Sequence, residues 1–169
     1  MADYFAGRIE IGGPLSRKVF EDLSAAILNE GWLSLIGYGD EPATEETLRK
    51  AFQAGQTVTL FDEQALYGQF DELEEFLVKH RIHFDRLSEA RYEYNAELVR
   101  YRGRGRPAVC PSNTDGECLI RAADVAVILA RRGTAACRLR AIRKLVTAPA
   151  SGALAPLHWV GEPSTARQD

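Results

Sequence analysis

The stretch RIEIGGPLSRKVFEDLSAAI, residues 8–27, places a strand and a helix next to each other. Ile9 and Ile11 alternate with charged residues at the period of a half-buried strand, and the residues GGP at 12–14 end it. Apolar residues then recur at helical spacing, and Ser16 can cap that helix. A strand followed by an amphipathic helix predicts a mixed fold in which helices pack on a sheet.

The rest of the first hundred residues repeats this alternation. Further strands are expected over residues 32–36, 56–61, 82–84 and 91–95, and further helices over residues 44–54 and 71–80. Asp71, with Glu74 three residues later, resembles a capping box at a helix start. The order predicts an α+β fold, specifically a ferredoxin-like split βαβ sheet with a helix inserted where the middle hairpin would be. One sheet face would then be solvated, covered by the C-terminal segment, or used for binding.

The sequence RGRGRP, residues 102–107, has the composition of a flexible basic connection, so a domain boundary is expected there. Residues 119–132 are apolar almost all round, which predicts a buried helix, and Thr134 can cap another helix after it. Trp159 is the one residue expected to anchor the tail. The predicted division is an acidic α+β domain over 1–101, a linker and turn over 102–118, a basic helical segment over 119–147 and a flexible tail over 148–169.

The net charge of −3 conceals a division along the chain. Residues 1–100 contain 19 acidic and 10 basic side chains, whereas residues 101–169 contain 5 acidic and 11 basic ones. Such asymmetry can serve solubility or cancel inside the fold, and it can also create a binding surface. An acidic surface attracts a basic groove on another protein, including one built for nucleic acid. The predicted partner-binding residues are Asp71, Glu72, Glu74, Glu75, Asp85, Glu89, Glu93 and Glu97.

Two other functional classes compete with this hypothesis. The basic helix could contact nucleic-acid phosphates through Arg138, Arg140, Arg143 and Lys144, although a pI of about 5.7 disfavours long-range steering toward nucleic acid. Alternatively, two of the carboxylates between Asp85 and Glu97 could perform acid–base chemistry in a small hydrolase. No histidine stands at a known catalytic spacing from them, and there is no G-x-S-x-G, Walker or dinucleotide-binding motif. A non-enzymatic protein without a cofactor is therefore favoured.

Metal binding is the remaining chemistry to weigh. His80, His83, Cys110, Cys118 and Cys137 could supply zinc ligands, but seven residues separate the first two cysteines and the third stands alone. Core packing or plain exposure explains these cysteines better, and no metal site is predicted. An odd number of cysteines without a dense framework fits a reduced compartment. Because a secretory signal and a 20-residue apolar run are also missing, we expect a cytoplasmic protein without a membrane contact.

A resemblance covers three segments: GQFDELEEFL at residues 68–77, IHFDR at 82–86 and YEYNAELVRYR at 92–102. Together they are similar to a group of uncharacterised bacterial proteins associated with plasmids, phages and integrated elements. The group has no established catalytic residues that could be carried over. The resemblance implies that the acidic surface could belong to an inhibitor of host defence, such as an anti-CRISPR or anti-restriction protein. It leaves the partner and the oligomeric state open.

Overall fold

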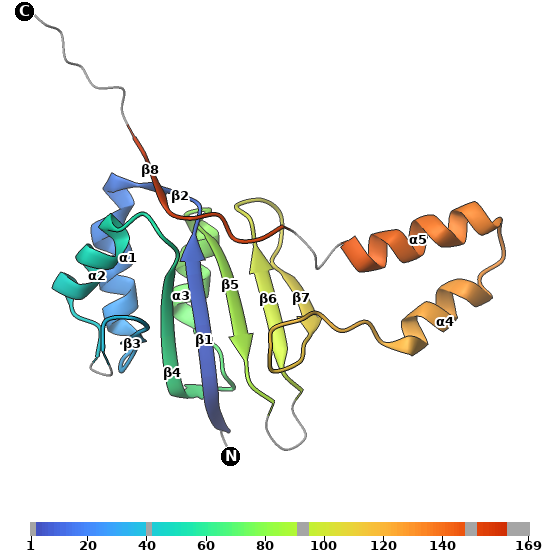
Figure 1. Cartoon of the computed structure of the whole chain (residues 1–169), viewed down its shortest axis with the longest axis horizontal. Helices are drawn as coiled ribbons and strands as arrows, with labels where there is room; N and C mark the ends of the chain where they lie inside the picture. Colours follow the sequence, from blue (N-terminus) through green and yellow to red (C-terminus); the bar gives the residue numbers. More distant parts are fainter. Residues whose placement is uncertain (1–2, 40–41, 91–94, 148–151, 162–169) are drawn as a thin grey trace, which may run out of the picture.

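The computed structural model describes residues 3–39, 42–90, 95–147 and 152–161, and within them the protein is a mixed α and β fold (Figure 1). The large sheet contains β1 (Tyr4–Gly12), β3 (Ser34–Leu35), β4 (Val58–Leu66), β5 (His83–Ser88), β6 (Glu97–Tyr101) and β7 (Ala108–Pro111). Its order is β3-β4-β1-β5-β6-β7, and all neighbouring strands run antiparallel. The helices are α1 (Arg17–Asn29), α2 (Glu45–Gln53), α3 (Asp71–Lys79), α4 (Ala122–Ala130) and α5 (Ala135–Thr147).

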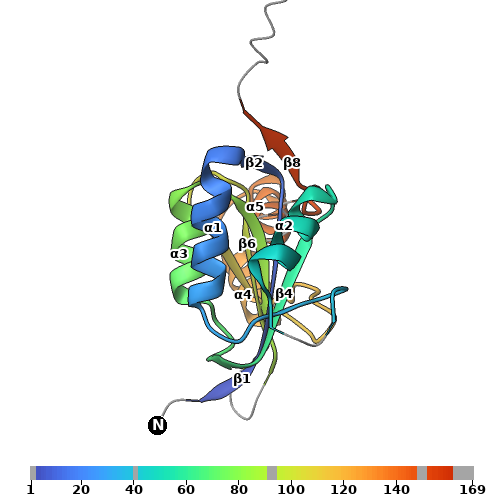
Figure 2. The same cartoon turned by 90° about the vertical axis from the view of Figure 1, so that its left-hand side faces the viewer.

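The main core lies between the sheet and the helices α1 and α3, which cover the same sheet face (Figure 2). Ile9 and Ile11 of β1 are fully buried on that face, as their alternation with charged residues predicted. Leu23 and Ile27 of α1 and Leu73 of α3 are buried in the same core. Truncating one such side chain to alanine typically costs about 2–5 kcal/mol.

The predicted linker at residues 102–107 is the turn between β6 and β7. Leu98 pairs with Cys110 and Arg100 pairs with Ala108 across this hairpin, so the sheet continues past the expected boundary. The glycines explain why this turn resembled a linker, because Gly103 and Gly105 adopt positive φ angles of 73° and 71°. The strand expected over residues 91–95 falls mostly on residues 91–94, which are not among those described, and the strand paired with β5 begins at Glu97.

The described part of the predicted tail, residues 152–161, runs back over the ends of β1 and β5 (Figure 1). The Gly13 amide donates to the Ala155 oxygen at 2.8 Å, and the His158 amide donates to the Gly13 oxygen at 3.0 Å. Strand β8 (His158–Val160) then pairs in parallel with β2 (Pro14–Ser16), and the Trp159 ring meets Phe20 edge-on at 5.7 Å. A Cβ at Gly12 would collide with the Ala155 oxygen, so the crossing requires glycine there.

The expectation of a buried helix over residues 119–132 is wrong. Helix α4 is shorter, and among its residues only Ile128 is buried, whereas Val127 and Leu129 are 58% and 53% exposed. An apolar helix is normally surrounded by protein, but α4 and α5 form a hairpin that projects beyond β7 (Figure 1). The Cys137 amide donates to the Thr134 hydroxyl at 3.3 Å, which confirms the predicted cap of α5.

Candidate functional site

Arg86 of β5 is buried on the helix-covered side of the sheet and forms ion pairs with two of the predicted binding carboxylates. Its Nε lies 2.8 Å from Oε1 of Glu74 on α3, and its Nη2 lies 2.6 Å from Oε1 of Glu97 on β6. Arg86 is only 3% exposed, so these pairs compensate a charge that water cannot reach. Burial raises the pKa of Glu74, and the nearby Arg86 opposes that shift. Glu74 and Glu97 therefore stabilise the fold and do not form a free binding surface.

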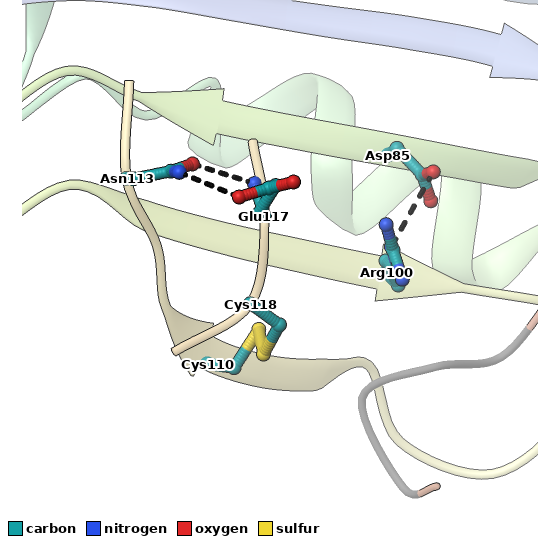
Figure 3. Close-up of a disulfide and its surroundings, with 6 residues drawn as sticks. All are labelled: Asp85, Arg100, Cys110, Asn113, Glu117 and Cys118. Carbon is teal, nitrogen blue, oxygen red and sulfur yellow. Dashed lines mark hydrogen bonds and ion pairs between the residues drawn. A yellow bond between two sulfur atoms is a disulfide. The ribbon is translucent and has the colours of Figure 1, made fainter. Parts of the chain in front are cut away.

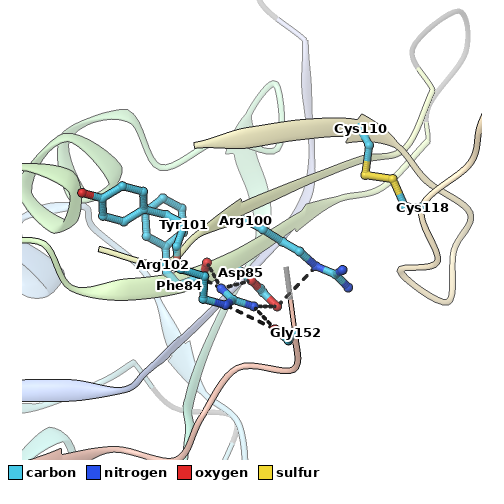
Figure 4. A network of polar contacts seen from close by, with 8 residues as sticks. All are labelled: Phe84, Asp85, Arg100, Tyr101, Arg102, Cys110, Cys118 and Gly152. Carbon is cyan, nitrogen blue, oxygen red and sulfur yellow. Dashed lines mark hydrogen bonds and ion pairs between the residues drawn. A yellow bond between two sulfur atoms is a disulfide. The ribbon is translucent and has the colours of Figure 1, made fainter. Parts of the chain in front are cut away.

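Asp85 belongs to a second ion-pair network on the opposite face of the sheet (Figure 4). Its two oxygens accept from Nη1 and Nη2 of Arg102 at 2.6 and 3.0 Å, and Oδ2 lies 3.6 Å from Nε of Arg100 (Figure 3). Arg102 also donates to the oxygens of Phe84 and Gly152, both at 3.0 Å. Both carboxylate oxygens of Asp85 are occupied by arginine contacts, which leaves them poorly placed to accept a proton from a substrate. The described contacts thus make Asp85 part of the attachment of residues 152–157.

The start of α3 is stabilised by Glu74 and Glu30, and Asp71 does not act as its cap. The N-cap residue is Phe70, whose amide donates to Oε1 of Glu74 at 3.3 Å. The Leu73 amide donates to Oε1 of Glu30, which lies just beyond the end of α1. The prediction that Asp71 caps α3 is therefore wrong. The amide of Leu73, the third residue of the helix, instead donates to Glu30, which lies 43 positions earlier in the sequence. Asp71 is left exposed at the positive end of the helix.

Four carboxylates lie around this helix start near enough for their charges to act on Glu30, and we call Glu30, Asp62, Asp71 and Glu72 the acidic patch. Burial raises the pKa of Glu30 most strongly, and the negative charges of Glu72, Asp71 and Asp62 raise it further, while the bond from Leu73 lowers it. Among the described residues, no ion pair neutralises Asp62, Asp71 or Glu72. The patch is an electrostatically unfavourable arrangement that a cation would relieve.

A groove of about 520 Å³ lies beside the acidic patch. Its lining residues are Trp32, Ser34, Phe61, Asp62, Glu63 and Gln64, which come from the loop before β3, from β3 itself and from β4. Trp32 is 72% exposed, the largest exposure of any large apolar side chain that the structure describes. An exposed indole beside carboxylates suits a guanidinium or ammonium group, which can contact the ring face and pair with an acid.

Most of the other residues predicted to bind a partner or nucleic acid are exposed. Glu75 and Glu89 are exposed, while Glu93 falls within residues 91–94, which the structure does not describe. On α5, Arg140, Arg143 and Lys144 are exposed, and Nη1 of Arg138 donates to the Leu129 oxygen at 3.1 Å near the end of α4. Glu30 and Trp32 were not predicted as site residues from the sequence, whereas Asp62 was expected to lie on the negative surface. The local sequence pointed to this site only through Trp32, a large apolar residue that follows Gly31 shortly before β3.

Cys110 and Cys118 form a disulfide, which corrects the expectation that core packing or exposure explains them (Figure 3). The bond joins β7 to the end of the loop that begins at Ser112, where a second small cluster contains Leu87 and Leu98. Cys137 is free and exposed. His80 stacks on Phe76 at 4.3 Å, and no group of three or more potential metal ligands occurs among the described residues.

Comparisons with known proteins found no matching family model, no matching curated protein and no matching solved structure. In the part of the chain that the structure describes, no helix has the length and apolar character needed to cross a membrane.

Proposed function

We propose that this chain is a non-enzymatic protein-binding module whose acidic patch and Trp32 groove receive a basic surface of another protein. The observation that carries the proposal is the meeting of unneutralised carboxylates with a highly exposed indole. Aromatic residues and charged pairs at the centre of an interface usually provide most of its binding energy. Of the eight carboxylates predicted from the sequence, Asp71 and Glu72 belong to this surface, and Glu30 and Asp62 extend it.

We further propose a ferredoxin-like relationship for the first part of the sheet. The connection from β4 through α3 to β5 leaves β1 between the two strands, and the connection from β1 through α1 to β3 leaves β4 between them. Two such split units, with α2 inserted before β4, support this description. The fold alone indicates no activity, so the functional proposal rests on the surface.

The partner class that fits best is a protein with a nucleic-acid-binding groove, because such a groove presents arginines and lysines to an acidic surface. This agrees with a role as an inhibitor of a host nuclease or CRISPR complex, which the mobile-element resemblance implies. We also propose a cytoplasmic setting, because a partner that handles nucleic acid works there. The Cys110–Cys118 disulfide is the observation that opposes this part of the proposal, since such bonds are rare in the reducing cytosol.

A second candidate is direct binding of nucleic acid by α5, which the exposure of Arg140, Arg143 and Lys144 favours. The proposed hydrolase receives no such support, because Asp85 and Glu97 are both engaged with arginines. Capture from a bacterial lysate, with and without nuclease treatment, separates the two binding functions. Capture of a basic protein that resists nuclease supports the first, whereas capture lost with the nucleic acid supports the second.

The patch itself is tested with a purified arginine- and lysine-rich peptide as the probe. Trp32→Ala should weaken its binding by about 30-fold, corresponding to a central aromatic contact of about 2 kcal/mol. Tyr38→Ala is the matched control, because Tyr38 is another exposed aromatic residue but lies near Lys50 of α2. Equal affinities of the two variants in calorimetric titration would refute the groove as the binding site.

A further inference from the structure

The α4–α5 hairpin exposes apolar side chains that nothing in the described chain covers. Val127, Leu129, Leu139 and Val146 are 58%, 53%, 63% and 47% exposed. The two helices contain only 9 and 13 residues, lengths at which helices in water depend on tertiary packing. They pack on each other and make no extensive contact with the sheet. A pair of short helices with this much exposed apolar surface is an incomplete packing unit.

The hairpin is also strongly basic. Residues 121–147 contain seven basic side chains and one acidic one. Two hairpins of this charge would repel each other, so a symmetric pairing of hairpins is disfavoured. The surface that would complete the unit must be acidic and must offer apolar contacts.

The same chain contains such a surface at the other edge of its sheet. The Trp32 groove involves β3 and β4, whereas the hairpin follows β7, and β3 and β7 are the first and last strands of the six-stranded sheet (Figure 1). Five inter-strand spacings of about 4.8 Å separate these edges by about 24 Å. The hairpin of one molecule therefore lies far from its own groove but is free to enter the groove of another.

We propose that a second copy of this chain binds head to tail, with its basic α4–α5 hairpin against the acidic patch and Trp32 groove of the first. This inference rests on the proposed function of the patch and identifies its partner. Exposed apolar residues of the hairpin cover the indole, and arginines of α5 meet the carboxylates at the start of α3. Because the two surfaces differ, the contact is heterologous, and each added copy leaves one hairpin and one groove open unless a ring or reciprocal pair closes.

Sedimentation equilibrium of the full chain tests this arrangement. The average mass should rise above 18.7 kDa as the concentration approaches about 100 μM, and the rise should be suppressed by high salt. A patch variant (Trp32→Ala, Asp71→Asn and Glu72→Gln) and a hairpin variant (Leu129→Gln, Arg140→Gln and Arg143→Gln) should each remain monomeric. Both variants change only exposed side chains, and circular dichroism checks that they fold.

The decisive measurement is the equimolar mixture of the two variants. One intact hairpin and one intact groove remain, so the mixture should form a dimer of about 37 kDa and nothing larger. The matched control (Tyr38→Ala, Asp22→Asn and Asp115→Asn) removes the same number of exposed aromatic and acidic groups elsewhere and should associate like the wild type. A mixture that stays at 18.7 kDa, or a wild type that is monomeric throughout, would overturn the proposal.

Two further results separate this inference from the function on which it rests. If the wild type is monomeric but the patch variant loses the basic peptide, self-association is wrong and the binding function stands. If the patch variant still binds that peptide, the function itself fails. Sedimentation of a monomeric wild type with anionic lipid vesicles, lost in the hairpin variant, would assign the hairpin to a membrane surface and overturn the proposal.

Discussion

Arg102 donates through Nε and Nη2 to the backbone oxygen of Gly152, at 3.3 and 3.0 Å, across 50 residues of sequence. The same guanidinium is held by both oxygens of Asp85, so a rigid strand positions the group that binds the incoming segment. The planar fork of arginine allows these contacts at once, whereas lysine has a single charged nitrogen. This relationship, together with the Gly13 and Ala155 hydrogen bond, attaches residues 152–157 to the sheet.

Arg102→Lys should therefore release this segment while keeping the charge. Hydrogen exchange of residues 152–160 should become faster, and the free energy of unfolding should fall by about 1–2 kcal/mol. Asp85→Asn should cost more, about 2–3 kcal/mol, because it removes the carboxylate that both terminal guanidinium nitrogens of Arg102 contact and that lies 3.6 Å from Arg100. Unchanged exchange at residues 152–160 in both variants would contradict the attachment.

The disulfide predicts how many thiols the native protein contains. Of its three cysteines, only Cys137 should react with a thiol reagent in denaturant without reductant, and all three should react after reduction. Replacing Cys110 and Cys118 with serine should lower the free energy of unfolding by about 2–3 kcal/mol, since the closed loop is short. Cys137→Ser is the control and should leave stability nearly unchanged, because that side chain is exposed. Three reactive thiols without reductant would disprove the bond.

Local sequence patterns predicted the elements whose periodicity matches their burial. The alternation around Ile9 and Ile11 lies in β1, and the helix expected from residue 44 is α2, which Thr44 caps through the Thr47 amide. These features depend on neighbouring residues, so a single sequence contains the information. The strand expected over residues 56–61 begins two residues later and extends to Leu66, because pairing with β1 continues past the apolar alternation.

The features that the sequence did not predict depend on distant partners. The role of Glu30 becomes visible only when α1 and α3 lie side by side, and the ion pairs of Arg86 require three elements to meet. A run of arginines and glycines after β6 looked like a linker because turns and linkers share a composition. The apolar residues of α4 predicted burial, but the described chain buries only Ile128 among them.

Trp159 should anchor the last described strand through its contacts with α1. Its ring meets Phe20 edge-on at 5.7 Å, and the Arg17 guanidinium lies 5.8 Å from the ring centroid. Trp159→Ala should lower the free energy of unfolding by about 2 kcal/mol, because aromatic contact and apolar burial are both lost. Trp32→Ala is the matched control and should change stability by less than about 0.5 kcal/mol, since its ring is mostly exposed. Urea denaturation of both variants makes the comparison, and equal losses would contradict the anchor.

The acidic patch should give the protein a characteristic dependence of stability on pH. Because the pKa of Glu30 is raised in the folded state, chiefly by burial, protonation of this carboxyl favours the fold. Its contribution to stability is fully present below the unfolded pKa of about 4.3 and is lost as pH rises through the folded value. Glu30→Gln cannot ionise but keeps an oxygen for the Leu73 amide. The variant should therefore gain stability relative to the wild type between about pH 4 and pH 7.

Glu46→Gln provides a control with the opposite sign. The hydrogen bond from Lys50 lowers the pKa of Glu46, so ionised Glu46 contributes stability above its unfolded pKa, and that contribution is lost as pH falls through the folded value. As pH rises over the same range, the free energy of unfolding of the wild type should consequently increase relative to that of Glu46→Gln. The increase should be small because the pair is exposed. Urea unfolding at a fixed protein concentration measures both differences. Parallel pH profiles for Glu30→Gln and the wild type would show that Glu30 is not strained by burial and by the neighbouring charges.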